Sequence, residues 1–233
     1  MSEPRHRALT RLTEAWPELD LAAPPTRAEL GAWLGPLRLG PGLAATLVDP
    51  AAAPDGYEAS VVDGRIPTRD RSWHDSFNAL AFLRFPRAKQ ALHARVLVLQ
   101  RARGRVGPRS REEDALALID ETALLVAGSP AGVAAFERAR ASQDLTALDR
   151  VVRGEGLLVE VFGHALLEHL VLARPPIGAG VVVLALTEPT CHAALDRALA
   201  ERIAAAGFPR PQLSPTLPWP DPVVDAWLPT IAG

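Results

Sequence analysis

The chain has three pairs of residues whose side chains could bind a metal ion or move a proton. Imidazole and carboxylate groups are frequent ligands of divalent ions and frequent general acids and bases. Each pair taken alone also has a purely structural interpretation, as a helix cap, a turn or a surface ion pair. The pairs are His74 with Asp75, Asp120 with Glu121, and His164 with Glu168.

The first pair lies in a segment with helical spacing, residues 73–83. His74 and Asn78 share one face of such a helix because they are four positions apart. Asp75 stands in the first turn, where the positive end of the helix dipole favours a carboxylate. We predict catalytic roles for His74, Asp75 and Asn78, with His74 as a metal ligand or a general base. The alternative is that Asp75 caps the helix and His74 is a boundary residue.

The other two pairs are predicted metal ligands. His164 and Glu168 are four positions apart, so both side chains can reach one ion, or the carboxylate can orient the imidazole. The spacing does not match His-Glu-x-x-His or its inverse, which argues against a metalloprotease. Asp120 and Glu121 are expected at the turn of a hairpin, where acids also occur for backbone hydrogen bonding alone.

The composition draws attention to one stretch of the chain. Arginine greatly outnumbers lysine, and Lys89, Asn78 and Tyr57 are the only residues of their types. All three stand between positions 57 and 89, and a compact ammonium is not interchangeable with a guanidinium. We therefore predict a catalytic role for Lys89, which could act as a nucleophile if desolvated. The alternative is a lysine on a solvated helix face.

Arginines near these segments suit an anionic ligand. Two or more of Arg65, Arg69, Arg109 and Arg111 could bind a carboxylate or phosphate with two hydrogen bonds each, and we predict Arg65, Arg69 and Arg111 as the substrate-binding residues. In a chain so rich in arginine, they could also be scattered surface residues. No glycine-rich phosphate loop and no Gly-x-Ser-x-Gly motif is present.

Several classes of protein are disfavoured by the composition. The net charge of -2 argues against a nucleic-acid partner. Cys191 is the only cysteine, which excludes disulfides within the chain and zinc sites with several thiolates. The longest apolar run, residues 177–186, is too short to span a bilayer, and no apolar segment follows the first residues. We expect a bacterial cytoplasmic protein with no membrane partner.

The elements that must position these residues indicate an α+β fold. We expect a single domain, mostly helical, with a small mixed or antiparallel sheet, over residues 1–207. Residues 208–233 are expected to be a Pro-rich arm packed on it, because they carry Trp219 and Trp227. Helices are expected over 7–16, 26–34, 73–83, 86–101, 131–141, 145–153, 163–171 and 191–206. Strands are expected over 43–48, 57–62, 115–119, 123–127 and 181–186. A helix over 111–118 is the competing interpretation for the strand at 115–119. Residues 157–162 are expected to be either a strand or the entry to a helix.

Six strings in order along the chain carry a resemblance to a known family. They are Tyr57-Glu58, Pro67-Thr68-Arg69, Trp73-His74-Asp75-x-Phe77-Asn78-Ala79-Leu80, Phe85-Pro86-Arg87-x-Lys89, Asp114-Ala-Leu-x-Leu-x-Asp120-Glu121 and Phe162-Gly163-His164-Ala165-Leu166-Leu167-Glu168. Over about residues 43–219 the chain resembles the bacterial domain-of-unknown-function family 3025. The resemblance implies no activity. Two positions depart from the family pattern: Thr122-Ala123, after Asp120-Glu121, and His93, in the helix of Lys89. The departure at Thr122-Ala123 weakens any specific role for the expected hairpin turn beyond its two acidic residues.

These observations lead to one main hypothesis and two alternatives. If the fold brings the three pairs together, they form a His/carboxylate site for a divalent metal ion, and the arginines bind an anionic substrate. The main hypothesis is a metal-assisted hydrolase acting on a phosphoester-like compound. The alternatives are a non-catalytic module that binds an anion or a protein, and a metal-free enzyme that uses Lys89 or a His74–Asp75 base. Whether the protein is an enzyme stays open at this point, as does its oligomeric state.

Overall fold

The computed structural model describes residues 6–40, 42–104, 107–187, 191–205, 207–208 and 216–229. These residues form eleven α-helices, one 3-10 helix (η1, Pro50–Ala52) and seven strands. The helices are α1 Arg7–Ala15, α2 Arg27–Leu34, α3 Tyr57–Val62, α4 Trp73–Arg84, α5 Pro86–Arg103, α6 Arg111–Thr122, α7 Pro130–Ala141, α8 Leu145–Gly154, α9 His164–Val171, α10 His192–Ala204 and α11 Pro222–Asp225. The strands are β1 Leu37–Leu39, β2 Leu43–Val48, β3 Arg65–Pro67, β4 Ala123–Gly128, β5 Leu158–Val161, β6 Ile177–Ala185 and β7 Leu217–Trp219.

The strands form two small mixed sheets. The larger has the order β5-β4-β6-β7, with β4 parallel to β6 and the two outer strands antiparallel to their neighbours. The smaller has the order β1-β2-β3, antiparallel and then parallel. The many helices and two mixed sheets confirm the predicted α+β class.

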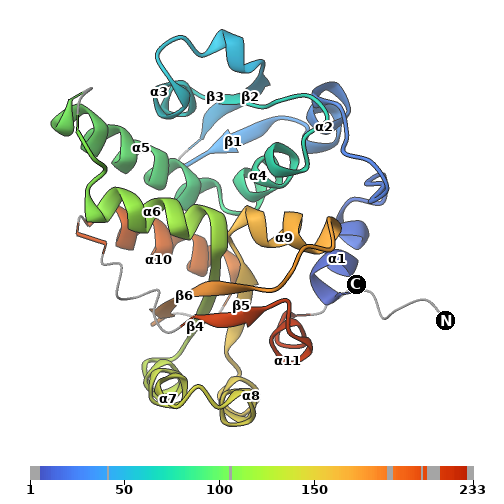
Figure 1. Ribbon diagram of the computed structural model, residues 1–233. Helices are drawn as coiled ribbons and strands as arrows, with labels where there is room; N and C mark the ends of the chain where they lie inside the picture. The colour runs from blue at the N-terminus through green and yellow to red at the C-terminus, as the bar shows by residue number, and fades with distance from the viewer. Residues whose placement is uncertain are drawn as a thin grey trace.

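Strand β4 is the centre of the core because helices cover both faces of its sheet (Figure 1). Leu124 and Val126 contribute to a cluster with α1, α7, α8 and α9. Leu125 and Ala127 contribute to a second cluster with α5, α6 and α10. Successive side chains of a strand point to opposite faces, so the sequence of a strand that is buried on both sides is an unbroken run of apolar residues.

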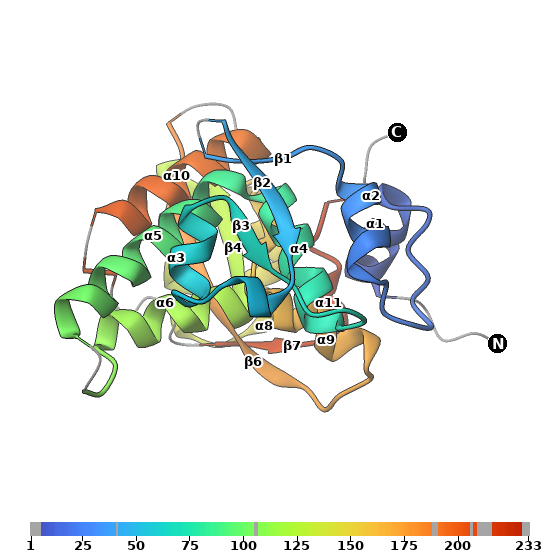
Figure 2. The same ribbon diagram turned by 90° about the horizontal axis from the view of Figure 1, so that it is seen from above.

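The smaller sheet and α3 lie on the side of the molecule away from α7 and α8 (Figure 1). In the view from above, they lie over α4 and α5, while α1 and α2 lie together at one edge (Figure 2). A third apolar cluster joins this sheet to α3 and α4 through Val61, Ile66 and Phe82. Tyr57 of α3 thereby reaches the ring of His93 in α5, with 5.3 Å between ring centroids.

Two expected strands are wrong. Residues 57–62 form helix α3, although tyrosine and two valines favour a strand. The intrinsic preference of six residues is weak, and packing against α5 decides their conformation. Residues 115–119 belong to helix α6, so the expected hairpin does not exist and the competing helix is confirmed.

The correction at α6 changes the setting of the acidic pair. Ser110 and Glu113 form a capping box that begins the helix, and Leu116 and Ile119 are buried on one face. The helix continues to Thr122, which places Asp120 and Glu121 in its last turn. Their side chains therefore leave a helix end and are not at the tip of a hairpin.

Most other expected elements are confirmed within a few residues, and the capping box at Thr26 and Glu29 is present as expected. The segment 157–162 contains a strand, β5. Elements β1, β3, β7, η1 and α11 were not expected. Residues 1–5, the expected helix end at Ala206, and residues 209–215 and 230–233 of the expected arm lie outside the described residues.

The described part of the arm is packed on the body. Strand β7 pairs with β6, and Trp219 is fully buried with its Nε1 donating to the Leu166 carbonyl oxygen at 3.0 Å. Trp227 Nε1 donates to the Asp149 carboxylate at 2.9 Å. The Asp225 carboxylate accepts from the backbone nitrogens at the start of α1, which ties the arm to the N-terminal helix. The domain boundary at residue 207 stays a prediction.

Within the described ranges, no helix combines the length and the apolar character that crossing a bilayer requires.

Candidate metal centre and its pocket

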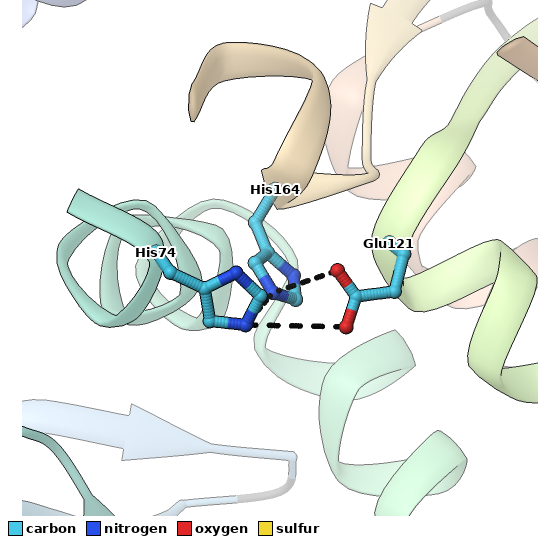
Figure 3. Close-up of side chains that lie close together, drawn as sticks. All are labelled: His74, Glu121 and His164. Atoms are coloured by element: carbon cyan, nitrogen blue, oxygen red, sulfur yellow. Dashed lines mark hydrogen bonds and ion pairs between the residues drawn. The ribbon is translucent and has the colours of Figure 1, made fainter. Parts of the chain in front are cut away.

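Three side chains from three helices meet at one point (Figure 3): His74 from α4, Glu121 from α6 and His164 from α9. Nε2 of His74 lies 3.0 Å from Nε2 of His164. The Glu121 carboxylate lies 3.9 Å from the first nitrogen and 3.5 Å from the second. One ligand atom from each residue lies within 4.8 Å of the others, so the cluster could hold a metal ion.

The ends of two helices bring His164 and Glu121 together. Glu121 is in the last turn of α6, and His164 is the first residue of α9, directly after Gly163. A Cβ on Gly163 would lie 2.5 Å from the Thr122 nitrogen and 2.6 Å from the Glu121 carbonyl carbon. Only glycine allows the start of α9 to approach the end of α6 this closely.

Glu168 contacts the cluster through His74 and not through His164. Its Oε2 lies 3.2 Å from Nδ1 of His74, and its Oε1 pairs with Arg174 at 3.1 Å. An ionised carboxylate only accepts hydrogen bonds, so Nδ1 of His74 carries a proton. Nε2 of a neutral His74 ring then presents its lone pair to the cluster. A carboxylate that orients a histidine in this way is the usual neighbour of a metal-bound imidazole.

The His164 ring is neutral at physiological pH. Burial lowers the pKa of His164 to about 3, against the opposing effect of the Asp120 carboxylate and with further lowering by the charge of Lys89. A neutral imidazole keeps a nitrogen lone pair for a cation. Burial also raises the pKa of Glu121, partly offset by His74.

The cluster lines a pocket of about 430 Å³ that gathers many of the predicted residues. Asp75, Asn78 and Asp120 line it beside His74, Glu121 and His164. Further lining residues include Tyr57, Glu58, Arg69, His93, Gln100, Arg109 and Glu113. The fold therefore brings members of all three pairs to one wall.

The Asp75 carboxylate binds Arg69 and not His74. Its carboxylate accepts from Arg69 Nε at 3.0 Å, from Nη2 at 2.8 Å and from the Arg69 backbone nitrogen at 2.6 Å. Burial favours a raised pKa for Asp75, but the hydrogen bonds from Arg69 outweigh it and hold the pKa below its usual range. Asp75 thereby fixes an arginine at the pocket wall.

Lys89 is fully buried behind the pocket. Its Nζ donates to Asn78 Oδ1 at 2.7 Å and to the Asp120 carboxylate, and lies 4.6 Å from the centroid of the Phe82 ring. Burial favours a raised pKa for Asp120, but Lys89, His164 and His93 lower it well below its usual range. Lys89 and Asp120 therefore form a buried ion pair.

The predicted anion-binding arginines are not all brought together. Arg69 lines the pocket, whereas Arg65 pairs with Asp63 at 3.6 Å and Arg111 is exposed at the start of α6, and neither of these two lines it. Arg109, a candidate that was not among the three predicted substrate-binding residues, lines the pocket. Nothing in the sequence separates Arg109 from the other arginines, because its position depends on how α6 meets α5.

A comparison with protein families identified a match over most of the chain. A family model described as "Protein of unknown function (DUF3025)" matches residues 46–226, a range that contains all three pairs and Lys89. No curated protein and no solved structure matched the chain.

Proposed function

This chain belongs to the DUF3025 family, whose description names no activity, and from its pocket we propose a metal-dependent hydrolase that acts on an anionic, phosphoester-like substrate. The observation that carries the proposal is the convergence of His74, Glu121 and His164 at one pocket wall. Two histidines and one glutamate are the protein ligands of several catalytic zinc sites.

The ligand set suits a catalytic ion better than a structural one. Structural zinc sites are closed by four protein ligands, whereas catalytic sites use three and leave a position open. Here the His74 side chain is 33% exposed and that of Glu121 is 43% exposed, while His164 is buried. A divalent ion held there would acidify a bound water and polarise a substrate oxygen.

The arginines of the same pocket support an anionic substrate. Arg69 is 63% exposed, and Asp75 engages its Nε and Nη2, so its Nη1 makes no hydrogen bond within the described part of the chain. Arg109 is exposed at the same pocket. A guanidinium held in place by a carboxylate binds a phosphate group with little loss of side-chain entropy.

The buried ion pair of Lys89 favours a second candidate, a non-catalytic anion-binding protein. Lys89 has no exposed surface and its ammonium is already paired, as expected of a structural network. His74 and Glu121, by contrast, are partly exposed at the pocket. The hydrolase is therefore the better supported of the two.

Metal content and hydrolysis test the proposal together. The purified protein should retain a divalent metal near one equivalent and hydrolyse p-nitrophenyl phosphate after loading with Zn²⁺ or Mn²⁺. His164→Ala should lose both the metal and the activity. His169→Ala is the matched control, because the same substitution on the same helix removes a side chain whose one hydrogen bond among the described residues is to the Pro175 carbonyl oxygen. A wild-type protein without metal, whose melting temperature no added ion raises, would overturn the proposal.

A further inference from the structure

The only tyrosine, the only asparagine and the only lysine of the chain form one hydrogen-bonded series. Nζ of Lys89 donates to Oδ1 of Asn78 at 2.7 Å. Nδ2 of Asn78 donates to the hydroxyl oxygen of Tyr57 at 2.6 Å. The series runs from a fully buried ammonium to a side chain at the pocket, and it joins helices α5, α4 and α3.

The direction of the series follows from the chemistry of its first member. An ammonium has three donors and no acceptor, so Asn78 must turn its oxygen toward Lys89. The amide NH₂ group of Asn78 then faces Tyr57, and the Tyr57 oxygen must accept. This removes the usual ambiguity between the two ends of an asparagine amide. The Tyr57 hydroxyl proton must therefore point to another acceptor.

That acceptor is missing from the protein itself. Within the described part of the chain, no group accepts a hydrogen bond from the Tyr57 hydroxyl, and Tyr57 is one of the residues that line the pocket of the His74–Glu121–His164 cluster. Burial, together with the negative charge of Asp120, raises the pKa of Tyr57, so the phenol keeps its proton at physiological pH. The pocket thus contains a neutral donor whose partner must come from outside.

The hydrogen bond from Asn78 strengthens this donor, against burial and the Asp120 carboxylate, which raise the pKa of Tyr57. Each hydrogen bond in a chain polarises the next, and the effect is larger where water is excluded. The positive charge of Lys89 lies at the donating end of the series, with Phe82 and Phe162 beside it. A donor held in place before the substrate arrives is the arrangement that stabilises developing negative charge on oxygen.

We propose that the Tyr57 hydroxyl is the oxyanion-binding donor of this pocket and donates a hydrogen bond to a non-bridging oxygen of a phosphate-like group. Asn78 and Lys89 are its positioning residues. The role in catalysis rests on the proposed hydrolase function, since the cluster has to hold the reacting phosphoester at the same pocket. The binding of an oxyanion by Tyr57 does not require hydrolysis.

The single tyrosine allows a direct spectroscopic test. Protein labelled with tyrosine carrying ¹³C at Cζ should give one resonance, which reports on the Tyr57 oxygen. Inorganic phosphate added to the zinc-loaded protein should shift this resonance in a saturable way. Tyr57→Phe should weaken phosphate binding by about tenfold or more, the usual cost of removing a hydrogen bond to a charged group. It should also lower kcat for p-nitrophenyl phosphate by about 100-fold while metal content stays unchanged.

Asn78→Asp provides a second variant with almost unchanged volume. The new carboxylate still accepts from Lys89, but it has no proton to donate, so the Tyr57 hydroxyl turns to donate to it. Phosphate binding should then fall as in Tyr57→Phe, although the hydroxyl is still present. Because Asn78 lines the pocket, the new carboxylate also repels phosphate, so the decisive readout for this variant is the Tyr57 ¹³C resonance, which should no longer shift when phosphate is added to saturation.

The outcomes separate this inference from the proposed function. If the wild type binds metal and hydrolyses the ester, and both variants keep wild-type phosphate affinity and kcat, the oxyanion role of Tyr57 is overturned and the hydrolase stands. If the wild type binds no metal but phosphate still shifts the Tyr57 resonance and needs the hydroxyl, the oxyanion role stands and the hydrolase falls. If phosphate causes no shift with or without zinc, the oxyanion role is wrong.

Discussion

Nε2 of His74 lies 3.0 Å from Nε2 of His164, although 90 positions separate the two residues. Two imidazole nitrogens this close must share a proton or a cation. Glu168 holds the proton of His74 on Nδ1, so the His74 nitrogen that faces His164 offers a lone pair in the neutral ring. The nearby Glu121 carboxylate adds a third acceptor. A divalent cation would satisfy all three groups at once.

Glu168 should tune the affinity of the cluster without being a ligand. Glu168→Gln removes the charge that orients His74 Nδ1–H and pairs with Arg174. We expect the Zn²⁺ affinity to fall by about 10–100-fold, measured by competition with a chromophoric chelator. Glu155→Gln, an exposed residue after α8, should leave the affinity unchanged. Equal affinities for Glu168→Gln and the wild type would show that the carboxylate does not support the site.

Gly163 should be needed because it lets the start of α9 approach the end of α6 closely, and not because of its backbone flexibility. Gly163→Ala places a methyl group against the backbone of Thr122 and Glu121, so α9 must move away from α6. We expect a loss of about 1–3 kcal/mol in the free energy of unfolding, measured in urea, together with weaker Zn²⁺ binding. Gly154→Ala at the end of α8 is the control, because a Cβ there meets open space. It should be neutral or stabilising by up to about 1 kcal/mol. Similar stabilities for the two variants would contradict the prediction.

Glu112 should make stability depend on pH in the acid range. Arg95 donates to its carboxylate at 2.8 and 2.9 Å, which lowers the pKa of Glu112 below its usual value of 4.5. The stabilisation is fully present above that usual value and is lost as the pH falls through the lower folded-state pKa. Glu112→Gln should therefore cost up to about 1 kcal/mol at pH 7 and progressively less below pH 4.5.

Thermal unfolding between pH 3 and pH 7 measures this effect. The stability of Arg95→Gln should likewise approach that of the wild type as the pH falls, because either substitution breaks the same ion pair. A stability difference that stays constant down to pH 3 would contradict the assignment.

Trp219 should be a main anchor of the C-terminal segment. Its ring is fully buried, and its Nε1 donates to the Leu166 carbonyl oxygen in α9. Trp219→Ala should lower the free energy of unfolding by about 3–5 kcal/mol. Trp219→Phe keeps most of the buried area and should cost only about 1–2 kcal/mol, mainly from the lost hydrogen bond. Urea unfolding measures both, and a near-neutral Trp219→Ala would show that the segment is not part of the cooperative fold.

Local patterns were sufficient to predict most helices. The capping box at Thr26 and Glu29 marks the start of α2, and apolar spacing marks α4 and α5. These signals depend on neighbours within about one helical turn, which the sequence contains. The same local reasoning was wrong for α3 and for the first half of the expected hairpin, where weak intrinsic preferences gave way to tertiary packing.

The sequence by itself determined which side chains are of types that could bind a metal ion or move a proton, and only the tertiary structure decided which of them meet. Asp75 adjoins His74 in the chain, but adjacent residues of a helix point in different directions, so Asp75 binds Arg69 instead. The partners of His74 stand 47, 90 and 94 positions away. In the same way, composition singled out Tyr57, Asn78 and Lys89, yet their hydrogen bonds join three different helices. Contacts between distant elements depend on how their apolar faces pack, and that information is spread over the whole chain.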